Sequence, residues 1–377
     1  YKRQRQLTSG DWVVDELVGI DVDGDYIYLT GNRETPLERH LYRTTLMQPG
    51  ELERVTRREG FHGIAFADDG KRYIDRYSNA NSPLQVSLHE GSGERITWLE
   101  ENAVTAGHPF HTYMQDWIAP EFGSVDAADG TALYYRLFKP RGHERGGKHP
   151  AIVFLYGGPH AQLVTNSWQG GFGSTYMDLQ YLAQQGFVVL TLDNRGSANR
   201  GTKFEHAIYQ HLGRVEVQDQ VRGVEFLKTL PYVDAENIGV HGHSYGGYMT
   251  LMAMSTAPRS FKAGVAGAPV TDWHLYDTYY TERYMNLPQS NPSGYTGSSV
   301  FPHAMRLQGS LFIYHGMADD NVLFTNSTKL YKVLQDAAIP FEMMDYPGKK
   351  HGIRGRNTGI HLRHTVTRFF ERELAGD

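Results

Sequence analysis

The chain has 377 residues, enough for two to three domains as a first expectation and for a sizeable core. Hydrophobic residues make up 40% of it and charged residues 21%, which argues against wholesale disorder, and the net charge of -5 argues against a nucleic-acid-binding protein. Because the sequence has no cysteine and no apolar run of the length that a membrane helix needs, it excludes disulfides, zinc thiolate sites and a cysteine nucleophile and predicts no membrane span.

The first hundred residues show short alternating segments with turn-forming Asp-Gly and Pro-Gly pairs between them, a pattern typical of strands. We expect about eight strands, four up to Thr56 and four more to Leu99. A four-stranded unit of about forty-five residues has the size of a propeller blade. Residues 1–102 are therefore predicted to form a partial β-propeller of about two blades, with a small open sheet as the alternative. Clear strand segments are 25–30, 40–43, 63–66 and 72–77.

Residues 103–120 are predicted as a linker that includes a short helix, and from residue 121 onward the pattern changes. Buried strand types now alternate with amphipathic segments of helical length. Such alternation predicts an α/β domain over residues 121–377, with a mostly parallel sheet that helices cover on both faces. Predicted strands are 151–155, 187–192, 238–240, 262–267, 311–314 and 341–346. Predicted helices are 176–185, 215–229, 245–257, 325–337 and 357–374.

A G-x-S-x-G motif at residues 242–246 lies between a predicted strand and a predicted helix. This strand–turn–helix setting is that of the nucleophile elbow in the α/β-hydrolase fold, in which the glycines allow a sharp turn and close backbone approach. We therefore predict that Ser244 is a nucleophile and that the backbone N–H of Tyr245 is one oxyanion donor. The alternative is a serine that caps an ordinary helix.

In this fold an acid and then a histidine follow the serine along the chain. The loop after the last strand but one offers Asp319 and Asp320, which the residue pattern alone does not separate. The loop after the last strand offers His351, whose imidazole can accept the serine proton near neutral pH. His243 and His315 lie nearby but out of chain order, and we interpret them as structural neighbours.

The second oxyanion donor is expected from the loop after the strand at 151–155. That loop reads Tyr-Gly-Gly-Pro at residues 156–159, similar to the HGGG type but with tyrosine in the first place. A hydroxyl can donate where a backbone N–H otherwise serves. Tyr156 is therefore the second candidate donor.

Several motifs taken together resemble the prolyl oligopeptidase family of serine peptidases, and within it the dipeptidyl peptidases. The motifs lie at residues 155–159, 193–197, 242–248, 280–285, 315–322 and 351–352. The resemblance implies that Ser244 is the nucleophile, Asp319 the acid and His351 the base. It also implies that the Tyr156 hydroxyl and the Tyr245 N–H form the oxyanion hole.

The resemblance further implies a pocket for the ring of a substrate proline. Its walls would be Val270, Trp273, Tyr276, Tyr280 and Val322, and Asn321 would donate a hydrogen bond to the carbonyl of the preceding substrate residue. Flat aromatic walls suit a compact apolar ring. Without the resemblance, core packing explains the tyrosine cluster equally well.

The implied activity is that of a serine exopeptidase that releases N-terminal dipeptides with a penultimate Pro or Ala through an acyl-enzyme, without metal or organic cofactor. The family binds the substrate amine with paired glutamates on its propeller, and no convincing equivalent occurs here. The length rule therefore stays open, with tripeptidyl peptidase, acylaminoacyl peptidase and oligopeptidase activities as alternatives. A simple esterase and a non-catalytic peptide-binding protein are further alternatives.

For the protein as a whole, we expect the chain to be a mature product or the C-terminal portion of a longer protein. The missing propeller blades would then lie on another segment or chain. We also expect a homodimer that uses the last helix, and a periplasmic or secreted location with the cytoplasm as the alternative.

Overall fold

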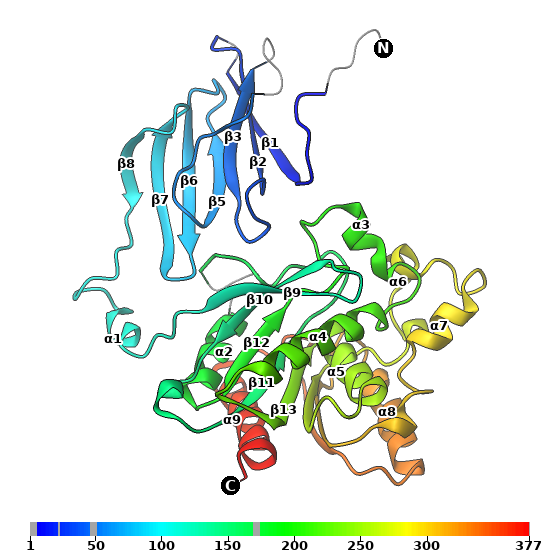
Figure 1. Ribbon diagram of the computed structural model, residues 1–377. Coiled ribbons are helices and arrows are strands. Elements are labelled where there is room, and N and C mark those ends of the chain that lie inside the picture. The colour runs from blue at the N-terminus through cyan, green and yellow to red at the C-terminus, as the bar shows by residue number, and fades with distance from the viewer. Residues whose placement is uncertain (1–5, 22, 46–50, 169–173, 377) are drawn as a thin grey trace. The chain divides into compact units, whose positions relative to one another are not determined.

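The computed structural model describes residues 6–21, 23–45, 51–168 and 174–376 (Figure 1). The chain divides into two compact units. The first comprises Tyr1–Ala119, Val164–Tyr176 and Asn199–Thr202, and the second Pro120–Leu163, Met177–Ala198 and Lys203–Asp377. The division into a propeller part, a linker and a catalytic domain stays a prediction. Within the described residues, none of the helices is long and apolar enough to cross a membrane.

The first unit contains two four-stranded antiparallel sheets, in the orders β1-β2-β3-β4 and β5-β6-β7-β8. The strands are β1 (Val14–Asp21), β2 (Tyr26–Gly31), β3 (His40–Thr45), β4 (Glu53–Arg54), β5 (Phe61–Phe66), β6 (Arg72–Asn79), β7 (Ser82–Glu90) and β8 (Arg95–Glu100). Buried Tyr28, Leu41, Val55 and Tyr73 form a core shared by the two sheets. The grouping into four and four strands agrees with the sequence prediction, and the assignment to propeller blades stays a prediction. A short helix, α1 (His111–Met114), follows.

The second unit is built on an eight-stranded sheet with the order β16-β15-β14-β13-β11-β12-β10-β9. All pairings from β12 to β16 are parallel, and the hairpin of β9 and β10 adds an antiparallel edge. The strands are β9 (Glu121–Asp126), β10 (Ala132–Phe138), β11 (His149–Phe154), β12 (Val188–Leu192), β13 (Val233–His243), β14 (Ala263–Gly267), β15 (Ser310–Gly316) and β16 (Glu342–Tyr346). This architecture confirms the predicted α/β-hydrolase class.

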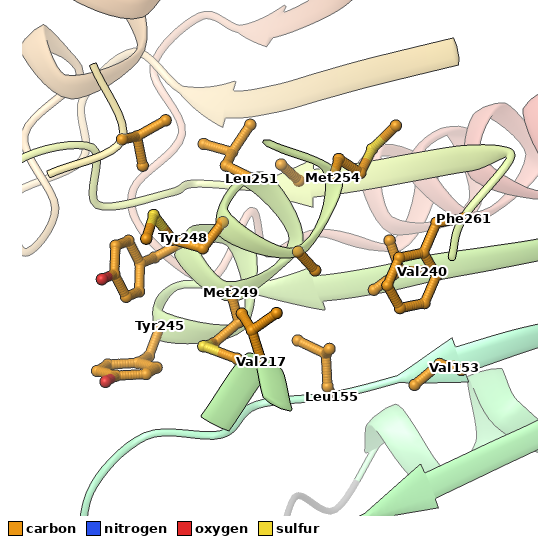
Figure 2. Packing of buried hydrophobic residues seen from close by; sticks show 14 of the residues in the cluster. Val153, Leu155, Val217, Val240, Tyr245, Tyr248, Met249, Leu251, Met254 and Phe261 are labelled. Atoms are coloured by element: carbon orange, nitrogen blue, oxygen red, sulfur yellow. The ribbon is translucent and has the colours of Figure 1, made fainter. Parts of the chain in front are cut away.

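Helices cover both faces of this sheet. From residue 174 onward the helices are α2 (Ser174–Gln184), α3 (Thr202–Glu205), α4 (Val215–Thr229), α5 (Tyr245–Thr256), α6 (Thr278–Met285), α7 (Pro292–Ser298), α8 (Thr325–Asp336) and α9 (Arg356–Phe370), of which α4 and α5 pack directly on the central strands. On one face, Val153 and Val240 of the strands share a core with Val217 of α4 and Met249 of α5 (Figure 2). On the other face, Gly239 leaves room for Phe370 of α9.

The central strands and long helices lie where the sequence pattern places them, and α4 has the predicted bounds. The strand β13 begins at Val233, five residues before the predicted start at residue 238. The edge hairpin of β9 and β10 was not predicted as strands. Its first strand has exposed and half-buried residues only, so it lacks the apolar run that marks the central strands.

Candidate active site

The turn from β13 into α5 places Ser244 in an unusual backbone conformation. Its φ is 63° and its ψ is -120°, a combination that residues other than glycine rarely adopt. The Ser244 N–H donates to the carbonyl of Gly267 on β14 at 2.8 Å. A Cβ at Gly247 would lie 2.3 Å from that same carbonyl, and one at Gly246 would lie 2.4 Å from the carbonyl of Leu155. The glycines of the motif are therefore required because α5 packs directly on neighbouring backbone.

The three residues that the sequence assigns to catalysis meet above the carboxyl ends of β13, β15 and β16. The Nε2 atom of His351 lies 2.9 Å from Ser244 Oγ, and its Nδ1 atom lies 2.7 Å from Asp319 Oδ2. Because a carboxylate only accepts, the proton belongs on Nδ1, which leaves the Nε2 lone pair to accept from the serine hydroxyl. The arrangement can therefore activate the hydroxyl as a nucleophile.

Asp319 lies in a fully enclosed position, with none of its side chain exposed. Its Oδ1 atom accepts the backbone N–H groups of Asn321 at 2.9 Å and Val322 at 3.0 Å. Burial would raise the pKa of this carboxyl, but hydrogen bonds from His315 and His351 outweigh it and hold the pKa well below its usual range. Asp319 is thus ionised near neutral pH.

The neighbouring Asp320 has the opposite surroundings. Its side chain is 61% exposed and pairs with Lys350, whose side chain is also largely exposed. This pair links the loop after β15 to the loop after β16 on the outside of the site. The geometry therefore separates the two aspartates that the residue pattern left open, and it favours Asp319 as the partner of His351.

Two histidines that the sequence interpretation treated as neighbours have defined contacts. The ring of His243 lies 4.8 Å from that of His351, and its Nδ1 atom lies 3.2 Å from the Tyr314 hydroxyl. Burial, and then the adjacent His351, lowers the pKa of His243 to about 3, so this ring stays neutral. His315 contacts Asp319 directly, at 3.0 Å from Oδ2. Chain order gives no signal for such a contact.

Tyr156 and Tyr245, the candidate oxyanion donors, lie side by side with ring centroids 5.9 Å apart. Burial, with smaller effects of Tyr276 and Tyr284, raises the pKa of Tyr156 to about 12, so its hydroxyl remains protonated and able to donate. The hydroxyl of Tyr245 donates to Glu216 Oε1 at 2.8 Å. Its backbone N–H lies in the first turn of α5, where a helix provides no acceptor.

Buried amides hold the loop that carries Tyr156. The Nδ2 atom of Asn194 donates to the carbonyl of Gly157 at 3.1 Å, and the Nε2 atom of Gln220 donates to Asn194 Oδ1 at 2.9 Å. Both amides are completely buried. Gly157 has a φ of 76°, in the left-handed region that glycine adopts freely. The sequence pattern gives no signal for this role of Asn194 and Gln220, since their partners lie far away along the chain.

The residues expected around a proline ring form an aromatic cluster beside the elbow. Trp273 stacks on Tyr280 with centroids 6.2 Å apart, and Tyr276 meets Tyr280 edge to face at 5.3 Å. Val270 and Val322 are buried in the same core. These five residues therefore come together, as a binding wall requires.

Asn321 is connected to this aromatic cluster. The Tyr276 hydroxyl donates to its Oδ1 atom at 2.9 Å. The amide oxygen is thereby engaged as an acceptor, and the side-chain NH2 is the part of the amide that donates. Asn321 can thus present a donor.

Among the described residues, no group of three or more His, Asp or Glu is arranged to hold a metal ion, and the expectation of a cofactor-free reaction stays a prediction.

Sequence comparisons identify relatives of both halves of the chain. The model of the prolyl oligopeptidase family matches residues 174–377, and that of the dipeptidyl peptidase IV (DPP IV) N-terminal region matches residues 1–84. Dipeptidyl peptidase 8 of Mus musculus is 36% identical over 388 residues, which cover 99% of this chain and 43% of that protein. Dipeptidyl peptidase 4 of Sus scrofa is 31% identical over 382 residues, covering 97% of this chain and 48% of that protein.

A solved structure shows the same relationship in three dimensions. The crystal structure of Porphyromonas gingivalis dipeptidyl peptidase 4 has a TM-score of 0.90 at 34% identity, covering 98% of this chain and 51% of that chain. The chain thus spans about half the length of its relatives, or less. Because the family model alone matches more than half of the chain, the motifs identified it correctly: this chain belongs to the prolyl oligopeptidase family.

Proposed function

We propose that the chain carries the catalytic centre of a serine exopeptidase that releases N-terminal dipeptides with a penultimate Pro or Ala. The observation that carries the proposal is the line of contacts from Ser244 through His351 to Asp319, with distances of 2.9 Å and 2.7 Å. The names of the dipeptidyl peptidases that it resembles support the same reaction.

In the proposed mechanism, Ser244 Oγ attacks the carbonyl carbon of the scissile bond while His351 Nε2 takes its proton. Asp319 keeps the imidazole in the required tautomer and stabilises the imidazolium. The Tyr156 hydroxyl and the Tyr245 N–H stabilise the oxygen of the tetrahedral intermediate. His351 then protonates the leaving amine, and water, activated by the same histidine, hydrolyses the acyl-enzyme.

The proposed specificity rests on the aromatic cluster and on Asn321. The side chains of Val270, Trp273 and Tyr280 would enclose a five-membered ring at low entropic cost because they are rigid. The Asn321 amide, whose oxygen is engaged by Tyr276, would donate to the carbonyl of the N-terminal substrate residue. The residues that bind the substrate amine are not identified in this chain.

The test is hydrolysis of Gly-Pro-anilide and of N-acetyl-Gly-Pro-anilide, with Ser244→Ala as control. Turnover of the free-amine substrate alone, lost in the variant, is the expected result. Turnover of both substrates would support the triad and the proline preference but contradict the release of dipeptides from a free N-terminus. Turnover of simple esters only would favour the esterase alternative, and no turnover of any substrate would favour the peptide-binding alternative.

Assembly and location are separate proposals. The expected homodimer would use α9, and light scattering combined with size-exclusion chromatography would test it through the mass in solution.

The missing blades would lie on another segment or chain. The proposed location is the periplasm or the exterior, with the cytoplasm as the alternative. Cell fractionation of the full-length protein would distinguish these compartments.

A further inference from the structure

Asp319 is contacted by two histidines on the same carboxylate oxygen. His351 Nδ1 lies 2.7 Å from Oδ2, and His315 Nε2 lies 3.0 Å from it. The His315 side chain is fully buried. Its Nε2 atom also lies 2.9 Å from the carbonyl of Val322, and its Nδ1 atom lies 2.7 Å from Ser327 Oγ on α8. His315 thus connects the acid to a helix that supplies no other group to the triad.

The partners of His315 determine its tautomer. A carbonyl oxygen and an ionised carboxylate only accept hydrogen bonds, so Nε2 must carry a proton. In the neutral ring Nδ1 is then an acceptor, and the hydroxyl of the completely buried Ser327 can donate to it. Phe324 meets the imidazole edge to face at 5.5 Å and limits its rotation. The serine hydroxyl thus supports the tautomer that the two acceptors at Nε2 require, and it holds the ring in place from the other side.

We infer that His315, oriented by Ser327, is a positioning residue that fixes Oδ2 of Asp319 toward His351 and limits the basicity of His351. This inference rests on the proposed function of the triad. A hydrogen bond donated to a carboxylate oxygen withdraws negative charge from it. The oxygen that His315 contacts is the one that faces His351, so the bond weakens the stabilisation of the imidazolium. A general base is most effective when its pKa lies near the working pH.

Other groups around His351 do not explain the same effect. The ring of His243, at the end of β13, lies 4.8 Å away and stays neutral because burial lowers its pKa to about 3. The charges of Asp320 and Lys350 pair with each other in solvent. Asp319 is therefore the charged group that contacts the ring, and His315 is the second side chain that donates to its Oδ2.

The test compares His315→Leu, His315→Gln and Ser327→Ala with the parent protein. His315→Leu removes the donor, and Gln can restore an N–H near the Nε2 position. We expect His315→Leu to lower kcat about tenfold to a hundredfold with little change in KM, as loss of an orienting partner does in metal sites. The acid limb of the pH–rate profile should move to higher pH. Ser327→Ala should shift the acid limb in the same direction. His315→Gln should regain most of the kcat that His315→Leu loses.

A direct titration of His351 by NMR makes the result independent of turnover. The proton between His351 and Asp319 reports the pKa of His351 whether or not the substrate is hydrolysed. His241→Leu is the matched control, because His241 is a strand histidine bonded to the Val265 carbonyl that makes no contact with Asp319. A higher pKa in His315→Leu and Ser327→Ala, but not in the control, supports the inference. An unchanged pKa in both overturns it, whereas absent turnover with a shifted pKa overturns only the proposed function.

Discussion

Two adjacent aspartates show how much of a residue's role depends on its surroundings. Asp319 is enclosed and receives hydrogen bonds on both carboxylate oxygens, whereas Asp320 is exposed and pairs with Lys350. An exposed ion pair contributes little, because solvent screens it. A buried carboxylate that orients a catalytic imidazole is expected to matter far more.

We therefore expect Asp319→Asn to reduce kcat about 10⁴-fold, since the amide can hold the imidazole in the wrong tautomer. Asp320→Asn should retain a rate close to that of the parent protein, and it serves as the matched control. Steady-state kinetics with Gly-Pro-anilide measure both effects. The reverse pattern would assign the acid to Asp320 and contradict the geometry.

At the scale of elements, the loop after β11 depends on a residue that follows β12. Asn194 donates to the carbonyl of Gly157, directly after Tyr156, and accepts from Gln220 of α4. A buried group that loses its partner costs about 1–3 kcal/mol unless the structure relaxes. The loop and its tyrosine would be the part that relaxes.

Asn194→Ala should therefore lower kcat by weakening the position of the Tyr156 hydroxyl. Tyr156→Phe should lower kcat about 10²- to 10³-fold, the effect of one lost oxyanion donor. In the double variant the two losses should combine to less than their product, because both act on one donor. A product of independent effects, measured in the same assay, would show that Asn194 acts elsewhere.

The same elements show what the sequence could and could not predict. Helix α4 and the central strands follow from apolar periodicity and from breakers such as Pro231, and the elbow follows from glycines around Ser244. The first strand of the edge hairpin, β9, lacks a strong apolar pattern. Contacts such as His315 with Asp319 and Asn194 with Gly157 join separate loops through polar groups, for which no periodicity exists.

At the scale of the whole molecule, a buried carboxyl makes stability depend on pH. Glu216 on α4 is completely buried, and among the described residues its Oε2 atom has no hydrogen-bond partner. Burial raises its pKa from the ordinary 4.5 to about 7. The unfolded chain loses this proton above about pH 4.5. Between that pH and about 7 the folded state holds more protons, so stability falls as the pH rises.

Glu216→Gln should remove this dependence, because an amide keeps its shape and does not ionise. The pKa difference corresponds to about 3 kcal/mol, lost between pH 4.5 and about 7 and constant above. Melting temperatures at pH 5 and pH 8 measure it. The difference between the melting temperatures at pH 5 and pH 8 should narrow in Glu216→Gln. It should persist in Glu225→Gln, because Glu225 is an exposed residue on the same helix. An unchanged difference in Glu216→Gln would show that Glu216 is not its source.

At position 244 the proposed reaction requires serine, whereas the backbone conformation favours glycine. A φ of 63° with a ψ of -120° costs a side-chain-bearing residue about 1–3 kcal/mol, and glycine is largely exempt. Ser244→Gly should thus melt at a higher temperature than Ser244→Ala, because alanine keeps the Cβ. Neither variant carries the serine hydroxyl, so the comparison concerns stability alone. Equal melting temperatures would argue against this backbone strain. Selection for heat resistance alone would thus favour glycine at this position and would remove Oγ, the proposed nucleophile.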